Sequence, residues 1–446
     1  MPVEARIESD YTLKLAGELI EPAPIFRRNS VAYKQDGSMV TVDNPRFETS
    51  VFGQGIMIEE GASNIVPTWP TGWTVSGNAG MSAVDQGVQP GAAGNTVRLT
   101  NSGATEGEYS SPLFALSPST TYTLRIKARG TVAPGTFDAH VLSNTGTLIQ
   151  LDGNLFPGGA WSPTANFQVI YSTFTTTADI TGANQQIRFD HDGNDAGYIE
   201  IAEVTLIQKA YALSFPGYGA TRAAEVMTVP TAGIFVKGAW TVEGTITPKI
   251  PTNVGNIDKS LFYCYIDASN YYKFVLGWGG EWHLSVRSNA VDKIISGGGA
   301  SMGTAYSWMI AGNGSVIRLC VNGVQIGSDL LYTEPIGTLP ANIYIGSFSD
   351  STAQANGIID DLRISSRART LSEHQTWWNG GSPSAFTVDA DTTLLVPFDG
   401  NFDIKLPFRL YSDGNIRVPK FTEDAGFKLN QNHELTTYAL VEGVVL

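Results

Sequence analysis

The stretch Ile317-Arg-Leu-Cys-Val-Asn-Gly-Val-Gln325 carries the sharpest local indication of how this chain folds. Asn322-Gly323 supplies two successive residues that tolerate positive φ, which a type I′ hairpin turn requires. The residues before the turn are mostly apolar or β-branched, as in a half-buried strand. The stretch therefore predicts two antiparallel strands joined by a two-residue turn.

Strand-length segments of the same kind recur on both sides of this hairpin, between residues 213 and 380. They show period-two alternation or enrichment in β-branched residues. The segments are 240–246, 260–266, 271–276, 282–286, 306–310, 342–345 and 358–364. So many short strands, separated by turn residues, predict an antiparallel β-sandwich.

A second series of such segments precedes this one, within residues 59–212. Its members are 97–100, 121–127, 167–174, 186–189 and 198–207. The fold class expected from both series is all-β, with two antiparallel β-sandwiches of jelly-roll type in tandem.

Two shorter regions flank the sandwiches. Residues 1–58 are broken by prolines and predict an extended N-terminal docking segment, which packs alone or on a partner. Residues 381–446 predict a small C-terminal β segment that completes its core with a neighbouring chain. Between them, Thr370–Trp378 predicts one helix, with Ser372 as its cap and Gly380-Gly381 as its stop.

Composition excludes several classes of protein. The chain has 446 residues, enough for about three domains. Its net charge of −14 argues against a nucleic-acid binder, which needs a basic face. The two cysteines, Cys264 and Cys320, exclude a disulfide scaffold and a cysteine-rich zinc module.

Targeting signals are also missing from the sequence as given. The first ten residues have no apolar core, and no apolar run approaches the ~18 residues of a membrane span. We expect a protein made in the cytosol without membrane insertion.

Four motifs in the later block resemble known domains. Val321–Gly327, Ile343–Gly346, Gly357–Ile364 and Ser366–Glu373 resemble the hairpin, the following strand and the closing segment of concanavalin A-like, laminin-G-type domains. Arg369-Thr370 departs from the usual pattern. The resemblance implies that residues 213–380 form a glycan-binding-like sandwich.

The flanks of the earlier block resemble tail proteins of tailed bacteriophages. Pro45–Phe47, Gly55–Glu60 and Ser63-Asn64 are similar to their lead segment, and Ser214–Ala224 is similar to their linker. In such proteins a carbohydrate-binding-module-like sandwich lies between the two, here residues 59–212. The resemblance implies a virion component of tail-fibre or receptor-binding type.

Sugar recognition uses flat aromatic rings against C–H patches, together with amides and carboxylates for the hydroxyl groups. The candidates for glycan contact are Trp69, Trp73, Trp161, Tyr271, Trp278 and Trp282. The alternative for each of these side chains is packing in a core or between chains.

No cofactor is required by the sequence, but calcium is an alternative at four carboxylates. These candidate ligands are Asp190, Asp192, Glu203 and Asp360. Asp190 and Asp192 alternate as in a calcium loop, although the glycine and glutamate of an EF-hand are missing. On a regular strand Asp360 shares a face with Leu362 and Ile364, so it needs a hydrogen bond or a cation.

Catalysis is not expected. Gly299–Gly303 fits the G-x-S-x-G pattern around Ser301, but the strand before it and the helix after it that a nucleophile elbow needs are missing. The five histidines form no zinc motif. Glu59 and Glu60 are adjacent and point to opposite faces of a strand.

The function expected is therefore that of a phage virion protein that attaches to host-surface polysaccharide through non-catalytic sandwiches. We expect it to assemble in the host cytoplasm with other virion proteins, as a homo-oligomer such as a trimer, and to be exposed on the particle. The alternative is a purely architectural tail, baseplate or capsid-decoration protein. A polysaccharide-cleaving enzyme is a third reading.

Overall fold

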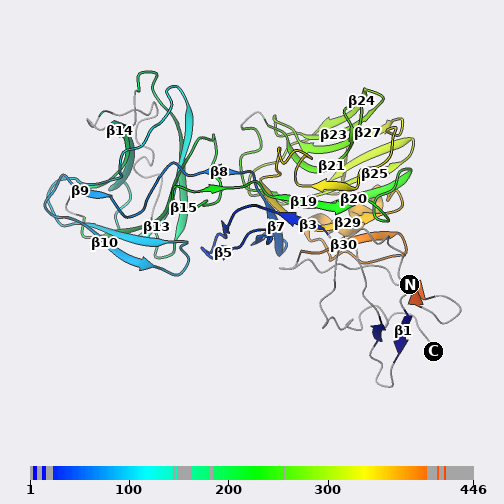
Figure 1. Ribbon diagram of the computed structural model, residues 1–446, viewed down its shortest axis with the longest axis horizontal. Coiled ribbons are helices and arrows are strands. Elements are labelled where there is room, and N and C mark those ends of the chain that lie inside the picture. The colour runs from blue at the N-terminus through cyan, green and yellow to red at the C-terminus, as the bar shows by residue number, and fades with distance from the viewer. Residues whose placement is uncertain are drawn as a thin grey trace.

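The computed structural model describes residues 24–143, 147, 163–180, 184–193, 195–254 and 257–398, and the backbone of four short terminal strands. These strands are β1 (Glu4–Ile7), β2 (Leu13–Ala16), β31 (Arg409–Leu410) and β32 (Ile416–Arg417). Two β-sandwiches lie side by side with a narrow connection between them (Figure 1). The predicted all-β, antiparallel class is confirmed.

The first sandwich consists of a five-stranded and a four-stranded sheet. The larger sheet has the order β10 (Met81–Val88), β11 (Asn95–Asn101), β17 (Tyr198–Ile207), β13 (Thr121–Gly130) and β15 (Gln168–Thr175). The smaller sheet has the order β14 (Phe137–Ser143), β16 (Gln185–His191), β12 (Gly107–Ser110) and β9 (Thr74–Ser76). Inward residues at every second position, such as Val97 and Leu99, form its core.

The second sandwich is larger. One sheet has the order β24 (Val291–Gly297), β23 (Trp282–Ser288), β22 (Asn270–Leu276), β21 (Lys259–Asp267), β28 (Asn342–Ile345), β19 (Val226–Pro230) and β3 (Ile25–Arg27). The other has the order β27 (Val324–Leu331), β26 (Val316–Val321), β25 (Tyr306–Asn313), β20 (Ala239–Pro248), β29 (Gly357–Ser365), β7 (Gln54–Ile58) and β6 (Phe47–Thr49), and β30 (Thr392–Val396) pairs with β29. The predicted hairpin turn is confirmed, because Asn322 and Gly323 have φ of 50° and 72°.

Strands from both flanking regions complete the second sandwich. Ile56 and Ile58 of β7 belong to its core, although residues 1–58 were expected to form a separate docking segment. Leu394 and Val396 of β30 also belong to this core, although they lie in the segment expected at 381–446. The first sandwich is therefore inserted in the chain between β7 and β19. Strands this short carry too little alternation to indicate which sheet they join.

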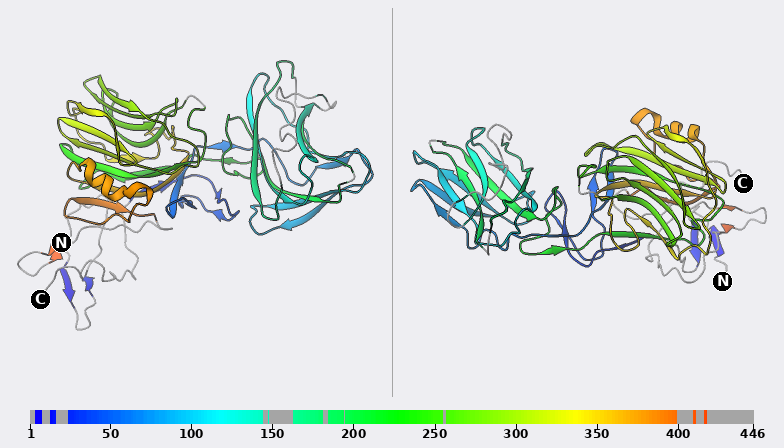
Figure 2. Two further views of the ribbon diagram at one scale, coloured as in Figure 1. Left: turned by 180° about the vertical axis from the view of Figure 1, so that it is seen from behind. Right: turned by 90° about the horizontal axis from the view of Figure 1, so that it is seen from above.

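A narrow junction connects the sandwiches (Figure 2). It contains β8 (Ala62–Ser63) paired with β18 (Thr221–Arg222), and the hairpin of β4 (Ala32–Tyr33) and β5 (Met39–Val40). Five fully buried charged side chains meet beside these strands. This junction cluster consists of Arg28, Arg46, Glu59, Arg222 and Glu225.

Each carboxylate of the junction cluster contacts two guanidinium groups. Glu59 lies 2.6 Å from Arg46 and 3.2 Å from Arg222. Glu225 lies 2.9 Å from Arg28 and 3.1 Å from Arg46. Burial alone would raise the pKa of Glu59, but the charges of Arg222 and Arg46 outweigh it and lower the pKa to about 2.

The helix α1 (Leu371–Trp378) packs on the eight-stranded sheet, and the short 3-10 turn η1 (Asn379–Gly381) follows it. Its N-cap is Thr370, which forms a capping box with Glu373, so the prediction of Ser372 as the cap was wrong. Ser372 is the second residue of the helix. Serine and threonine are both common N-cap residues, so the sequence alone does not show which of Thr370 and Ser372 is the cap. No helix in the described part of the chain is long and apolar enough to cross a membrane.

Candidate functional site

The outer face of the seven-stranded sheet carries a cluster of aromatic side chains. This tyrosine face consists of Tyr263, Tyr265, Tyr271, Tyr344 and Phe348. In β21 the tyrosines alternate with Phe262 and Cys264, whose side chains belong to the core. Residues that are directly opposite in neighbouring strands point to the same face. The register therefore places all four tyrosines on one face, since Tyr263 pairs with Tyr344 and Tyr265 with Tyr271.

The rings of the tyrosine face contact one another. The ring centroid of Tyr263 lies 4.7 Å from that of Phe348, 5.7 Å from Tyr265 and 6.1 Å from Tyr271. Each of these side chains is half-buried, so the rings keep part of their surface open to solvent. Burial raises the pKa of Tyr263 and Tyr271, which keeps both phenols protonated as hydrogen-bond donors.

Polar groups from the neighbouring strands border the rings. Lys273 lies 5.9 Å from the Phe348 ring centroid, and the Arg287 guanidinium lies 5.4 Å from that of Tyr271. Asp292 accepts hydrogen bonds from Arg287 at 2.7 Å and from Tyr271 at 3.0 Å. Partial burial alone would raise the pKa of Asp292, but these donors lower it. Burial, reinforced by the charge of Lys273, lowers the pKa of His283 on the same face.

Such a face can bind a sugar. The rings offer apolar surface for C–H groups, while phenols, cations and a carboxylate can exchange hydrogen bonds with hydroxyl groups. Sequence reasoning found only Tyr271 of this set. The alternation Tyr263-Cys-Tyr265 was a readable signal, but the pairing with β28 that brings Tyr344 alongside is not encoded locally.

Comparison with known families decides what kind of sandwich carries this face. Residues 249–373 match the model of the concanavalin A-like lectin/glucanases superfamily. The second sandwich therefore contains a concanavalin A-like domain. That superfamily includes both binding proteins and glycosidases, as its name states. The search of the curated proteins gives no match.

Parts of this chain are similar to several solved structures. Domain 4 of an extracellular arabinanase of Geobacillus stearothermophilus, in complex with arabinotriose, is 19% identical, with 38% of this chain and 80% of that chain covered and a TM-score of 0.29. A pentraxin of Limulus polyphemus is 18% identical, with 37% and 81% covered and a TM-score of 0.27. The receptor-binding domain of a botulinum neurotoxin C/D mosaic is 15% identical, with 35% and 41% covered and a TM-score of 0.29.

The remaining aromatic candidates in the concanavalin A-like domain have different surroundings. Trp278, in the turn between β22 and β23, is 60% exposed and can contact a ligand. Trp282 is 1% exposed and stacks on Phe274 in the core. Trp282 therefore packs in the core and is not available for the glycan contact that was expected from the sequence.

The first sandwich buries its own candidates. Trp69 and Trp73 meet edge to face at 4.7 Å within the core, and their indole N–H groups donate to the backbone carbonyls of Asn95 and Thr68. Neither ring is open to a ligand, because both are buried in the core, where Trp73 stacks on Phe189. Trp161 lies outside the described residues.

Asp190 is the calcium candidate with the most carboxylates around it. It lies on β16, not in a loop, and its ligand atom falls within 4.8 Å of those of Glu106 and Glu108. Arg188 reaches Asp190 at 2.7 Å and Glu108 at 2.9 Å, so a guanidinium already compensates much of the negative charge. Burial and the charge of Asp190 raise the pKa of Glu106 to about 7. Asp192, just beyond the strand, is exposed.

Glu203 serves internal ion pairs. The backbone of Glu203 has a φ of 53° at an irregularity in the pairing of β17 with β13. This irregularity turns the Glu203 carboxylate toward β13. The carboxylate lies 3.2 Å from both Arg125 and Lys127 and accepts the backbone N–H of Ala93 at 3.0 Å. These cations take the role that a metal ion would have.

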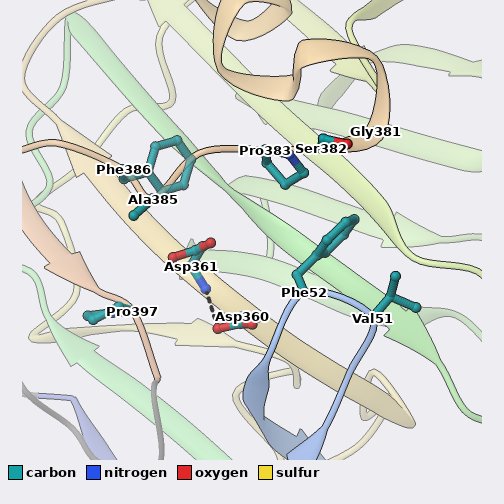
Figure 3. Close-up of a pocket in the computed structure, with 10 residues that line it drawn as sticks. All are labelled: Val51, Phe52, Asp360, Asp361, Gly381, Ser382, Pro383, Ala385, Phe386 and Pro397. Atoms are coloured by element: carbon teal, nitrogen blue, oxygen red, sulfur yellow. Dashed lines mark hydrogen bonds between the residues drawn. The ribbon is translucent and has the colours of Figure 1, made fainter.

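Asp360 differs from its expected orientation. The pairing of β29 with β20 shifts register near Gly244, and Asp361 there has φ of 50°. Ile359, Leu362 and Ile364 therefore point to the core, while Asp360 points to the opposite face. There it lines a cavity of about 420 Å³ that Asp361 also lines (Figure 3).

Two serines of the concanavalin A-like domain, Ser301 and Ser307, have different surroundings. Ser301 lies in an exposed loop, where its backbone N–H donates to the Tyr306 hydroxyl at 2.9 Å. Ser307 does meet His374 at 3.1 Å, and His374 lies 3.9 Å from Glu243. These three side chains are fully buried where α1 packs on the sheet.

Proposed function

We propose that this chain is a non-catalytic glycan-binding protein of a tailed-phage virion. In this proposal the concanavalin A-like domain contacts a host-surface saccharide through the tyrosine face. The observation that supports it is the set of half-buried rings at 4.7 to 6.1 Å centroid separation, bordered by Lys273, Arg287 and Asp292. Rings in this setting provide C–H contacts that a solvated polar face does not.

The virion assignment is supported by the two stretches that resemble phage tail proteins. In the structure these stretches pack against each other at the junction. The Glu59 carboxylate accepts the backbone N–H of Ser214 at 2.7 Å, and Asn64 donates to the carbonyl of Gly217 at 3.0 Å. The two stretches are therefore held together as one structural unit.

Each site is expected to bind weakly, because an open face buries little of a sugar and ordering costs remain. Several copies in a homo-oligomer would raise the overall avidity by linking the sites. No catalysis is proposed, and calcium is not needed for the contacts described.

The test uses the purified full chain and fragments of bacterial surface polysaccharide on an array, followed by titration calorimetry with each hit. We expect the Tyr263→Ala, Tyr271→Ala double variant to bind about tenfold more weakly or worse, since each ring contributes roughly 0.5–1.5 kcal/mol. Tyr171→Ala is the matched control, because Tyr171 is 40% exposed on the first sandwich.

Three results would argue against the proposal. Unchanged binding in the double variant would move the site elsewhere. An absence of binding to every surface polymer, together with firm incorporation into particles, would favour the architectural alternative. Release of new reducing ends from a bound polymer would make the protein an enzyme.

A further inference from the structure

The outer face of the five-stranded sheet in the first sandwich carries a row of charged side chains. In the strand register, Arg98 on β11 and Arg129 on β13 both lie directly opposite Glu200 on β17, the strand between them. We call these three residues the arginine row. Side chains alternate between the two faces of a strand. Since Val97 and Ile201 point into the core, the arginine row points away from it.

One buried carboxylate holds both guanidinium groups of the row. The Glu200 side chain is 2% exposed, and one of its oxygens accepts hydrogen bonds from Nε and Nη2 of Arg98 at 2.9 and 2.6 Å. Its other oxygen accepts from Nε of Arg129 at 2.6 Å. Burial alone would raise the pKa of Glu200, but Arg129 and Arg98 lower it, so the carboxylate is ionised at neutral pH. Two positive charges therefore share one negative charge.

Aromatic rings support the two guanidinium groups. Arg98 lies 4.2 Å from the ring centroid of Tyr198, and Arg129 lies 4.4 Å from that of Phe167. A guanidinium held by a ring and a carboxylate is already ordered, so it loses little freedom when it binds another group. The side chain of Arg98 is 40% exposed and that of Arg129 is 23% exposed. Both arginines can therefore be reached from solvent.

Each guanidinium keeps N–H groups for a further acceptor. Arg98 donates to Glu200 through Nε and Nη2, while Arg129 donates to Glu200 through Nε and to Gln89 through Nη2 at 3.4 Å. Within the described part of the chain, Nη1 of either arginine donates to no acceptor. A carboxylate can accept two parallel hydrogen bonds from the free edge of a guanidinium.

Positive charge is in excess on this face, although the whole chain has a net charge of −14. The three central strands carry four cations and two carboxylates, namely Arg98, Arg125, Lys127 and Arg129 against Glu200 and Glu203. Arg125 and Lys127 are buried and pair with Glu203. The remaining charged residue of the sheet, Asp85, lies opposite the core residue Val97 and so points to the other face. The arginine row is therefore the accessible cationic part of the sheet.

We propose that the arginine row binds the carboxylates of an acidic saccharide chain, such as a polymer of uronic acids. The two guanidinium groups lie on either side of Glu200, so a chain that repeats its negative charge can contact both. Val84, opposite Arg98 on the edge strand β10, is 50% exposed and offers apolar contact to sugar C–H groups. Nucleic acid fits less well, because the acidic remainder of the protein repels so dense a polyanion. The site does not depend on glycan binding by the tyrosine face.

The test is titration calorimetry on the full chain with oligogalacturonate, an alginate oligomer, the methyl ester of the oligogalacturonate and oligothymidylate. We expect the two acidic oligomers to bind about tenfold more tightly than the ester, which has the same sugars without the charges. Their binding should weaken as NaCl rises from about 0.01 M to about 0.15 M, because salt screens exposed charges. Absence of binding by both acidic oligomers, or equal binding of the ester, would overturn the proposal. Tighter binding of oligothymidylate would make the row a general polyanion surface instead.

Variants locate the site. Arg98→Gln should weaken the binding of oligogalacturonate about tenfold, and Arg98→Lys, which keeps the charge without the paired donors, should restore only part of it. Arg318→Gln removes an arginine from an exposed ion pair on the second sandwich and is the control. Melting curves like that of the unsubstituted chain show that the variants are folded. Unchanged binding in Arg98→Gln would contradict the proposal.

The same probes separate this site from the tyrosine face. The Tyr263→Ala, Tyr271→Ala double variant should bind oligogalacturonate as tightly as the unsubstituted chain does. Arg98→Gln should in turn keep its affinity for a neutral saccharide bound by the tyrosine face. Loss of oligogalacturonate binding in the double variant would assign the acidic saccharide to the tyrosine face and overturn the assignment to the arginine row.

Discussion

The Arg28 guanidinium lies 2.9 Å from the Glu225 carboxylate, 197 residues later in the chain, and both side chains are fully buried. The second oxygen of Glu225 accepts hydrogen bonds from Arg46 at 3.1 Å and from the backbone N–H of Glu59 at 2.9 Å. One carboxylate thus joins the chain entering the first sandwich to the chain leaving it. The junction cluster is expected to fix how the two sandwiches connect.

The first prediction concerns removal of that carboxylate charge. Glu225→Gln leaves Arg28 and Arg46 buried with less compensation, and breaking such a buried pair costs about 3–5 kcal/mol. We expect the free energy of unfolding, measured by urea denaturation, to fall by that amount. The exposed pair Arg318–Asp329 provides the control, since Asp329→Asn should cost less than about 1 kcal/mol. Equal effects of the two substitutions would show that the junction cluster does not stabilise the fold.

A second prediction follows from the pKa of Glu59, which is lowered to about 2 in the folded protein. A depressed pKa of an acid contributes stability that is complete above the pKa in the unfolded chain, near 4.3, and is lost as the pH falls toward 2. We expect the midpoint of urea denaturation to drop between pH 5 and pH 2.5. In Glu59→Gln this drop should become smaller relative to the midpoint at pH 7. A drop of the same size in both proteins would assign the acid sensitivity to other carboxylates.

Local turn chemistry and alternation were sufficient to predict much of the fold. Asn322-Gly323 fixed one hairpin, and the strand segments between 240 and 364 fall within the strands observed. The short strands that the flanking regions add to the second sandwich were not predictable in this way. β3, β7 and β30 are short, and what decides their place is pairing with strands far away in the sequence.

The candidate site was predicted less well for a related reason. Alternation indicates that neighbouring odd positions share a face, but a single irregularity reverses this, as happens between Ile359 and Leu362. Whether a tryptophan is exposed depends on the opposite sheet. Trp278 and Trp282 are four residues apart in the same glycine-rich turn region, yet one is 60% and the other 1% exposed.

That contrast gives a third prediction. Trp278→Phe should change the free energy of unfolding by less than about 0.5 kcal/mol and should reduce the fluorescence fraction that acrylamide quenches. Trp282→Ala should cost about 3–5 kcal/mol, because it empties core volume beside Phe274. If quenching is unchanged in Trp278→Phe, the ring is covered in solution, and it is no longer a candidate for ligand contact.

The last prediction separates the observed helix cap from the one expected from the sequence. The Thr370 hydroxyl accepts a hydrogen bond from the backbone N–H of Glu373 at 3.2 Å, and the Glu373 carboxylate accepts one from the backbone N–H of Thr370 at 2.8 Å. Thr370→Ala removes the side-chain half of this box and should cost about 1 kcal/mol in urea denaturation. Ser372→Ala should change stability by less than about 0.5 kcal/mol, because Ser372 lies inside the first turn and alanine favours helix there. A larger loss in Ser372→Ala than in Thr370→Ala would place the start of α1 two residues later, and with it the register that sets His374 against Ser307.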